Sequence, residues 1–269
     1  MVTFPPCKIN LGLDIISKRE DGYHNLDTVF YPVPWTDMLE IIPARQLSFQ
    51  SSGNLIPGRE EDNLCLKAYH LLKKEFDISP VQIHLHKIIP TGAGLGGGSS
   101  DAAHTLRLLN AVFDLQLSTD RLKQYAAQLG SDCAFFIGDE PMQGTGRGEQ
   151  LTPIELSLKD KYLVVIKPDV HVSTAEAYAG VKPQAPAIPL RDIIHLPLEK
   201  WKHQLTNDFE KTILTNYPVI AQLKEQFYAR KAVYASMSGS GSSVFGIFDE
   251  PPKADPSWQS LAHWSGWLL

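Results

Sequence analysis

A glycine-rich segment, PTGAGLGGGSSDAA at residues 90–103, constrains the fold of this chain more than any other feature. Five of the seven residues from Gly92 to Gly98 are glycine. Because glycine loses the most conformational freedom on folding, such a cluster indicates a backbone that must turn sharply or approach another group closely. An alternating apolar segment, VQIHLHKIIP, precedes the glycines, and a helical pattern, SSDAAHTLRLLNAVF, follows them. The expected local order is strand, glycine loop and helix.

Two familiar nucleotide-binding loops do not fit this segment. A P-loop needs the pattern GxxxxGK[ST], and no lysine lies in the segment or just after it. Gly92, Gly94 and Gly97 match the dinucleotide pattern GxGxxG, but a lone match is weak. A Rossmann unit would continue into a second parallel strand, whereas this helix leads to a second helical pattern, STDRLKQYAAQLG. A dinucleotide-dependent oxidoreductase is therefore only a distant alternative.

A phosphate cradle of another design is the functional interpretation that remains. Backbone N–H groups in a glycine loop can turn toward an anion, and the N-terminus of the following helix carries partial positive charge. The hydroxyls of Ser99 and Ser100 can donate to phosphate oxygens or join a Mg²⁺ shell. The competing structural interpretation is a flexible turn in which Ser100 or Asp101 caps the helix.

The bulk composition excludes several classes of protein. The 269 residues are 43% hydrophobic and 20% charged, as in ordinary globular proteins. The formal net charge is −5 and no basic block stands out, so we expect no nucleic-acid partner. The sequence shows neither a signal-peptide pattern nor a segment long enough to span a bilayer, so we expect no membrane partner. Cys7, Cys65 and Cys133 lie far apart, which argues against a disulfide framework and favours the reducing cytoplasm.

Strand and helix patterns alternate along the chain, which indicates the α+β class. Strands are expected near 2–16, 37–43, 46–53, 81–90 and 161–168, and helices near 61–76, 99–113, 118–130, 207–214 and 218–230. The segment DEPMQGTGRGEQLTP, 139–153, is rich in turn residues and fits either a hairpin tip or a linker. We place a domain boundary at its end, which gives domains of 1–153 and 154–269.

Five motifs in order along the chain resemble one enzyme family. PTGAGLGGGSSDAA is similar to the central phosphate-binding motif of the galactokinase, homoserine kinase, mevalonate kinase and phosphomevalonate kinase (GHMP) superfamily. CKINLGLDI near the start and MSGSGSSVFGIF near the end resemble its other two motifs. DGYHNLDTVF and LGSDCAFFIG are more specific, and resemble the branch that phosphorylates 4-diphosphocytidyl-2-C-methyl-D-erythritol.

The resemblance implies a fold and a reaction. The N-terminal domain would adopt a ribosomal S5 domain 2-like fold and bind the nucleotide. The C-terminal domain would be ferredoxin-like and bind the substrate, with the active site between the two. The implied reaction is ATP- and Mg²⁺-dependent phosphorylation of the 2-hydroxyl of 4-diphosphocytidyl-2-C-methyl-D-erythritol, in the non-mevalonate route to isoprenoids. The oligomeric state stays open.

The resemblance also assigns catalytic and nucleotide-binding residues. Phosphoryl transfer to an alcohol needs a group that accepts the hydroxyl proton, and Asp132 matches the catalytic aspartate. Lys8 would lie close to Asp132 and favour its ionised form. Without the resemblance, Asp132 would read as a helix-flanking aspartate and Lys8 as a surface lysine. The residues assigned to ATP are Asn63, Pro90, Gly92, Gly94, Leu95, Gly96, Gly97, Gly98, Ser99 and Ser100.

The substrate residues come from three motifs. Tyr23 would stack on the cytosine base, His24 would hydrogen-bond its polar edge, and Tyr178 would be the opposing aromatic ring. Asn10 would hold a substrate hydroxyl, because it shares a strand face with Lys8. The residues Ser238, Gly239, Ser240 and Gly241 would pack beside the nucleotide loop and approach the substrate phosphates, although a turn between elements is the structural alternative.

Several assignments have explicit alternatives. Asn63 fits the N-cap of the following helix as well as an adenine contact. Cys133 fits a small buried residue better than a nucleophile. His84 and His86 share a strand face without a third ligand, so we interpret them as a solvated edge and not a metal site. No protein ligand for Mg²⁺ is assigned. The rival functions are another kinase of the superfamily, acting on homoserine, mevalonate or a sugar, and a non-catalytic nucleotide-binding regulator.

Overall fold

The computed structural model describes residues 1–253 and 255–268. The chain forms two compact units that alternate along the sequence. Unit 1 comprises Met1–Lys8, Pro32–Thr91 and Gly96–Glu140, and unit 2 comprises Ile9–Tyr31, Gly92–Leu95 and the chain from Pro141 onward. The boundary expected at residue 153 stays a prediction.

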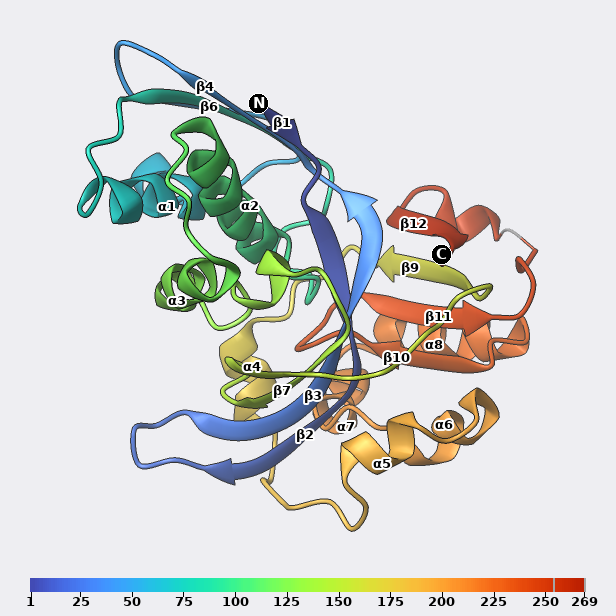
Figure 1. Cartoon of the computed structure of the whole chain (residues 1–269). Helices are drawn as coiled ribbons and strands as arrows, with labels where there is room; N and C mark the ends of the chain where they lie inside the picture. The colour runs from blue at the N-terminus through green and yellow to red at the C-terminus, as the bar shows by residue number, and fades with distance from the viewer. Residues whose placement is uncertain (254, 269) are drawn as a thin grey trace. The chain divides into compact units, whose positions relative to one another are not determined.

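Unit 1 combines a four-stranded sheet with three helices. The strand order is β1-β4-β6-β5, in which β5 and β6 are parallel and the other pairs are antiparallel. The helix α2 packs against β4 and against both other helices (Figure 1). The elements are β1 (Val2–Thr3), β4 (Met38–Pro43), β5 (Ser48–Gly53), β6 (Val81–Lys87), α1 (Leu64–Lys73), α2 (Gly97–Val112) and α3 (Thr119–Leu129), with short 3₁₀ turns η1 (Glu60–Asp62) and η2 (Phe135–Ile137).

The alternation predicted for β6 is confirmed. Val81, Ile83 and Leu85 are fully buried, while the intervening histidines are partly exposed. The solvated-edge interpretation of those histidines is wrong in one respect, because β6 pairs with strands on both sides and is not an edge strand. Their rings lie on the outer face of the sheet, where both hydrogen-bond the hydroxyl of Ser52.

A second sheet is built on the two long strands β2 (Pro6–Lys18) and β3 (His24–Thr36). Its order is β2-β3-β7-β8, and β7 (Met142–Gly146) with β8 (Gln150–Pro153) forms a hairpin. The turn-rich segment 139–153 is therefore a hairpin and not a linker. Asp21 and Gly22 lie in the turn between β2 and β3, as the dipeptide predicts.

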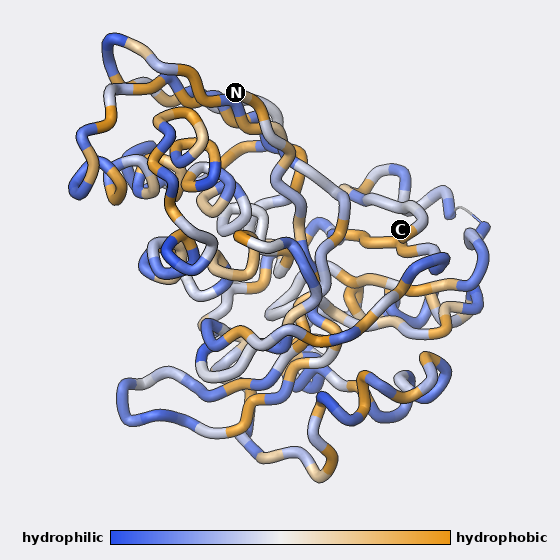
Figure 2. The backbone as a smooth tube through the Cα atoms, viewed as in Figure 1, coloured by the Kyte–Doolittle hydropathy of each residue, from blue (hydrophilic) through white to orange (hydrophobic). Residues whose placement is uncertain are grey.

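Unit 2 is completed by an antiparallel sheet of order β10-β11-β9-β12, and α8 lies along β10 and β11 (Figure 1). The central strand β9 is a continuous hydrophobic run (Figure 2), and it packs into the core of this unit. The helices α4, α5 and α6 and the strands β10, β11 and β12 were not predicted. The elements are α4 (Thr174–Ala179), α5 (Leu190–Ile194), α6 (Leu198–Gln204), α7 (Glu210–Asn216), α8 (Pro218–Ala229), β9 (Tyr162–Lys167), β10 (Tyr234–Met237), β11 (Val244–Phe248), β12 (Ala262–Trp267) and η3 (Pro256–Trp258).

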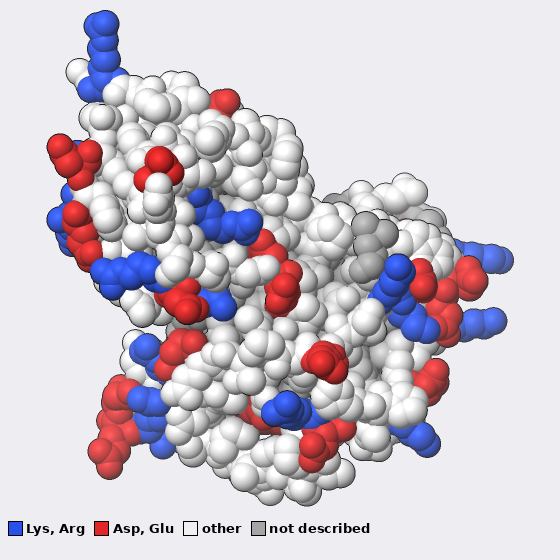
Figure 3. Space-filling model, in the orientation of Figure 1, with Lys and Arg blue, Asp and Glu red and all other residues white. Residues whose placement is uncertain are grey.

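The distribution of surface charge agrees with the small net charge and the lack of a basic block in the sequence. Basic and acidic side chains are interspersed on the face shown in Figure 3, and neither sign forms a continuous patch there. Among the described residues, no helix has both the length and the apolar character that a bilayer crossing requires.

Candidate active site

The glycine loop has the left-handed backbone that its composition predicts. Gly94 and Gly96 have φ of 77° and 71°. A Cβ at Gly94 would lie 2.0 Å from the backbone oxygen of Ser238, so no larger residue fits. A Cβ at Gly96 would lie 3.0 Å from the Phe136 ring and 3.3 Å from Cε of Lys8. The loop therefore needs glycine both for its conformation and for close packing.

The helix α2 begins directly in the glycine cluster. Its first residue is Gly97, two positions earlier than predicted, and Gly96 is its N-cap without a side-chain capping bond. The alternative in which Ser100 or Asp101 caps the helix is therefore wrong. With no capping side chain, the first N–H groups of α2 remain available to a ligand. Gly98 in this turn is exposed, and Ser99 is partly exposed.

Lys8 and Asp132 form an ion pair, as the resemblance implies. Nζ of Lys8 lies 3.6 Å from Oδ2 of Asp132, and the side chains are 4% and 32% exposed. Burial lowers the pKa of the Lys8 ammonium, while the Asp132 carboxylate raises it. The partly exposed Asp132 thus presents a carboxylate to solvent beside a buried cation. This is the charge arrangement that phosphoryl transfer to an alcohol requires.

The ion pair lies beside the first turn of α2. Cε of Lys8 lies 3.3 Å from the position that a Cβ of the N-cap residue Gly96 would take, and Cys133 is the residue next to Asp132. Cys133 is buried, and burial raises its pKa to about 12, so the interpretation as a small buried residue and not a nucleophile fits. A carboxylate, an ammonium and a free helix N-terminus therefore converge within unit 1.

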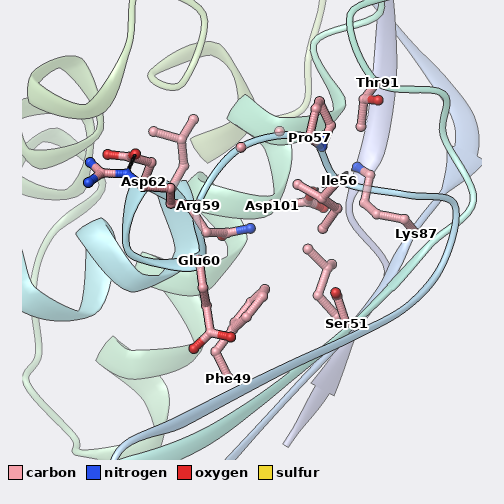
Figure 4. A pocket seen from close by; sticks show the side chains of 15 residues that line it. Phe49, Ser51, Ile56, Pro57, Arg59, Glu60, Asp62, Lys87, Thr91 and Asp101 are labelled. Carbon is pink, nitrogen blue, oxygen red and sulfur yellow. Dashed lines mark hydrogen bonds and ion pairs between the residues drawn. The ribbon is translucent and has the colours of Figure 1, made fainter.

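A cavity of about 330 Å³ lies next to this turn (Figure 4). Its walls come from β5, from the segment before α1, and from Gly98 and Asp101 of α2. Asn63 lines it and is also the N-cap of α1, since its Oδ1 accepts a hydrogen bond from the N–H of Cys65 at 2.9 Å. The capping interpretation of Asn63 is confirmed. Asn63 shares the lining of this cavity with the apolar side chains Phe49 and Ile56.

A buried charge cluster, two members of which line this cavity, was not predicted from the sequence. Nζ of Lys87 donates to Asp101 at 2.8 Å and also to Asp37, and all three side chains are at most 3% exposed. Asp37 also accepts the backbone N–H groups of Ile88 and Ile89. Burial opposes the charge on Lys87, but Asp101 and Asp37 together raise the pKa of Lys87. The period-two alternation of β6 was a usable signal, because it places residue 87 on the same inward face as Leu85.

In unit 2, the third motif packs against the glycine loop as expected. Oγ of Ser238 donates to the backbone oxygen of Gly94 at 2.9 Å and also accepts the N–H of Asn10 at 3.3 Å. The side chain of Asn207 donates to the backbone oxygen of Gly239 at 2.9 Å. Asn10 is 2% exposed and donates to Thr28, so its amide is held in one orientation. The segment is the turn of the β10–β11 hairpin, which confirms the structural interpretation, while its approach to the substrate phosphates stays a prediction.

The predicted base-binding residues also lie within unit 2. The rings of His24 and Tyr178 stack directly on each other, with centroids 4.9 Å apart and planes at 22°. Tyr23 is 57% exposed, and the guanidinium of Arg147 lies over its ring at 5.0 Å. Burial, with a smaller contribution from the Lys18 charge, lowers the pKa of His24, so its ring is neutral at pH 7. Arg147 was not among the predicted site residues.

Another unpredicted neighbour of the glycine loop is His171. A Cβ at Gly92 would lie 3.2 Å from Cε1 of its imidazole ring. No sequence pattern pointed to this contact, because the two residues are far apart in the chain and belong to different predicted elements. Of the remaining predicted residues, Pro90 precedes the loop, and Leu95 lies within it and is buried.

The donor set for a metal ion is sparse. Within the described part of the chain, no group of three or more His, Cys, Asp and Glu side chains is arranged to hold a metal. Ser100 is fully buried and its hydroxyl has no partner among the described atoms, whereas Ser99 is partly exposed. Of the two predicted serines, Ser99 is therefore the one placed to meet a ligand on the surface of α2.

Two family models match the chain. The model for the GHMP kinases N terminal domain matches residues 63–139, and the model for the GHMP kinases C terminal matches residues 191–262. Among curated proteins, the 4-diphosphocytidyl-2-C-methyl-D-erythritol kinase of Cytophaga hutchinsonii is 54% identical over 254 residues, which cover 94% of each chain. The enzyme of the same name from Bacteroides fragilis is 52% identical over 257 residues, again 94% of each chain.

Solved structures agree with the sequence comparisons. The crystal structure of a 4-(cytidine 5'-diphospho)-2C-methyl-D-erythritol kinase matches with a TM-score of 0.84 and 32% identity, covering 99% of this chain and 98% of that one. The mevalonate kinase of Methanococcus jannaschii matches with a TM-score of 0.70 at 14% identity, over 100% and 98% of the two chains, which shows a shared fold. The expected α+β fold with N- and C-terminal kinase domains is thereby confirmed.

Proposed function

Because the chain belongs to the 4-diphosphocytidyl-2-C-methyl-D-erythritol kinase family of the GHMP kinases, we propose that it phosphorylates the 2-hydroxyl of 4-diphosphocytidyl-2-C-methyl-D-erythritol. As a member of this family it is an ATP-dependent small-molecule kinase. The observation that carries the proposal is the Lys8–Asp132 ion pair beside the uncapped N-terminus of α2. The assignment of individual residues to steps of the reaction is our proposal.

ATP binds in unit 1 in this proposal. The adenine and ribose occupy the 330 Å³ cavity, where the free amide nitrogen of Asn63 donates to the base and Phe49 and Ile56 supply apolar contact. The phosphates meet the N–H groups of the first turn of α2, with the hydroxyl of Ser99 as an additional donor. Gly98 leaves this surface open, because nothing lies within 4 Å of the position its Cβ would take.

Asp132 accepts the proton of the attacking hydroxyl. A carboxylate can do this only when ionised, and the ammonium of Lys8 at 3.6 Å stabilises that form. The same ammonium stabilises negative charge on the attacking oxygen as the proton leaves. Lys8 is nearly fully buried, so its charge is little screened by water and acts strongly on both groups.

The cytidine end is bound by the aromatic residues of unit 2. Rings that stack at 4.9 Å leave no room for a base between them, so His24 and Tyr178 form one wall together. The base stacks on that wall or on the exposed ring of Tyr23. The neutral imidazole of His24 has one N–H donor and one acceptor for the polar edge of cytosine. Arg147 beside Tyr23 adds a positive charge suited to the diphosphate.

Mg²⁺ enters this proposal with ATP. When bound, it neutralises phosphate charge during transfer. The sparse donor set of the chain fits an ion held by phosphate oxygens and water, with Ser99 as the accessible hydroxyl. The expectation that no acidic protein ligand holds the metal stays a prediction.

The test is ADP release with a panel of alcohols that do or do not carry a cytidine diphosphate group. We expect turnover with 4-diphosphocytidyl-2-C-methyl-D-erythritol and a monophosphorylated product by mass spectrometry. Turnover with homoserine, mevalonate or a sugar in its place would support another kinase of the superfamily. ATP binding without ADP release on any alcohol would support a regulator, and either result would overturn the proposed substrate.

A further inference from the structure

A second cavity lies in unit 2 and contains none of the residues assigned to the reaction. Its volume is about 470 Å³. The walls are the segment from Gly180 to Ala187, the segment from Thr206 to Thr212, and Asp14 of β2. The backbone of β2 holds both walls, since the N–H of Gln184 donates to the oxygen of Ile15 and the N–H of Leu13 donates to the oxygen of Thr206.

Asp14 is an unusual residue to find in this wall. It is only 8% exposed, and its carboxylate has no hydrogen-bond or ion-pair partner among the described residues. Its neighbours Leu13 and Ile15 pack in the core of unit 2, so the alternation of the strand turns Asp14 away from that core. Burial raises the pKa of Asp14 to about 7, and the charges of Asp208 and Asp27 add to this effect.

Asp208 brings a second carboxylate to the same cavity. Its Oδ2 accepts the N–H of Ile15 at 2.7 Å, which fixes the side chain next to Asp14. Two adjacent carboxylates repel each other, and a buried charge without a partner costs free energy. A positively charged group in the cavity would relieve both penalties.

Two lysines add positive charge to the same cavity. Lys182 and Lys211 line it and are exposed, and neither has a carboxylate partner among the residues that the structure describes. The cavity thus combines buried carboxylates with ammonium groups at the solvent-exposed part of its lining. A bare divalent cation fits poorly. Ca²⁺ takes six to eight oxygen ligands and Mg²⁺ needs an octahedral set, whereas the carboxylates in this lining are those of Asp14 and Asp208.

We propose that this cavity is a second ligand site, which binds a small zwitterion. The ammonium group of the ligand pairs with Asp14 and Asp208, and its anionic group pairs with Lys182 or Lys211. The occupied cavity also includes Gly180, two residues after Tyr178 at the end of α4. Binding at this cavity does not depend on the proposed kinase reaction, so the two proposals can fail separately.

Isothermal titration of the full chain with three matched probes tests the site. The probes are 5-aminopentanoate, which carries both charges, 1,4-diaminobutane, which carries two ammonium groups, and glutarate, which carries two carboxylates. At pH 8, above the pKa of Asp14, we expect 5-aminopentanoate to bind at least tenfold more tightly than either other probe. No measurable binding of 5-aminopentanoate, or equal or tighter binding of a symmetrical probe, would overturn the proposal.

Substitutions then locate the binding. Asp14→Asn should weaken 5-aminopentanoate binding at least tenfold, and its melting temperature checks that it folds. Because Lys182 and Lys211 are exposed, their double substitution by alanine leaves the fold intact and should weaken the same probe. The control is Glu225→Gln, which removes an exposed charge from α8 and should leave binding unchanged. Wild-type affinity in both the Asp14 and the double lysine variants would overturn the site.

Discussion

Lys8 is a buried lysine whose carboxylate partner, Asp132, is partly open to solvent. A buried lysine normally loses its proton more easily, and burial does lower the pKa of Lys8. The charge of Asp132 opposes that shift without cancelling it, so the pKa of Lys8 stays below its ordinary value. The pair is suited to handling a proton, because the carboxylate meets solvent while the ammonium beside it is buried.

Replacing Asp132 by asparagine tests this assignment at the scale of one residue. We expect kcat to fall by about 10² to 10⁴, because the amide cannot accept the proton of the attacking hydroxyl. The dissociation constant for ATP should change little, since Asp132 lies outside the 330 Å³ cavity. Single-turnover kinetics and ATP titration measure the two quantities separately. A near-normal rate would remove Asp132 from the role of base.

At the scale of an element, the start of α2 depends on one backbone conformation. Gly96→Ala should destabilise the protein by about 2 kcal/mol, because alanine is strained at φ of 71° and its Cβ meets the Phe136 ring at 3.0 Å. The same Cβ would press on Lys8, so kcat should fall as well. Chemical denaturation and steady-state kinetics measure the two effects.

Gly98→Ala, two residues further on in the same turn, is the matched control. Gly98 is helical, exposed and free of neighbours within 4 Å of its would-be Cβ, so this variant should be as stable as the wild type or slightly more stable. Equal stability losses in the two variants would show that the strain at Gly96 is not the cause.

The buried cluster of Lys87, Asp37 and Asp101 joins α2 to β4 and β6. Lys87→Met removes the cation and leaves two carboxylates buried, which should cost about 3–5 kcal/mol of stability in urea unfolding. Lys67→Met removes a lysine whose ion pair with Asp62 is about half exposed, and should cost less than about 1 kcal/mol. A small loss for Lys87→Met would mean that the cluster does not anchor the helix.

The sequence predicted those elements whose signals are local. Examples are the alternation of β6, the helix α3, which has Ser118 as its N-cap and Gly130 as its C-cap, and the turn at Asp21 and Gly22. Each depends on residues within a few positions of one another. The strand β12 was missed because it contains Gly266 and polar residues and is stabilised by pairing with the distant strand β9. Its formation depends on the partner more than on its own propensity.

The same distinction between local signals and contacts made by distant segments explains which site residues were predicted. The glycine cluster and the motif residues Lys8 and Asp132 were predicted because a resemblance carried their roles. Asp101, beside the predicted Ser100, went unrecognised as a site component because its partner Lys87 lies on another element. Arg147 and His171 were missed for the same reason, since each reaches its neighbour through the tertiary fold. Conversely, the stacking of His24 directly on Tyr178 could not be deduced from their spacing.

For the whole molecule, the proposed function predicts that a nucleoside triphosphate and a cytidine ligand each stabilise the folded protein, independently of each other. A ligand that binds only the folded state raises Tm according to its concentration and affinity. Cytidine 5'-diphosphate and ATP, each at about a hundred times its dissociation constant, should each raise Tm by several degrees. His24→Ala should lose most of the cytidine 5'-diphosphate shift and keep the ATP shift, because it removes one ring of the stacked pair in unit 2.

The control for this experiment is His195→Ala, which removes an exposed imidazole at the end of α5. Both ligand shifts should persist in that variant. If His24→Ala diminished the two shifts equally, the ring would support the whole fold and not a base site. Differential scanning fluorimetry at fixed ligand concentration is sufficient for all three proteins.

The three cysteines have a practical consequence. Cys7, Cys65 and Cys133 are buried with pKa values raised by burial, so their thiols should be unreactive in the native protein. Cys7 precedes Lys8, Cys65 follows the cap residue Asn63 by two positions, and Cys133 follows Asp132. The chain thus carries an unreactive thiol close in sequence to each of three proposed site residues. The rate at which a thiol reagent labels each cysteine would therefore measure how often the structure around it opens. A bound ligand that slows this opening would slow the labelling, and no substitution is needed for the measurement.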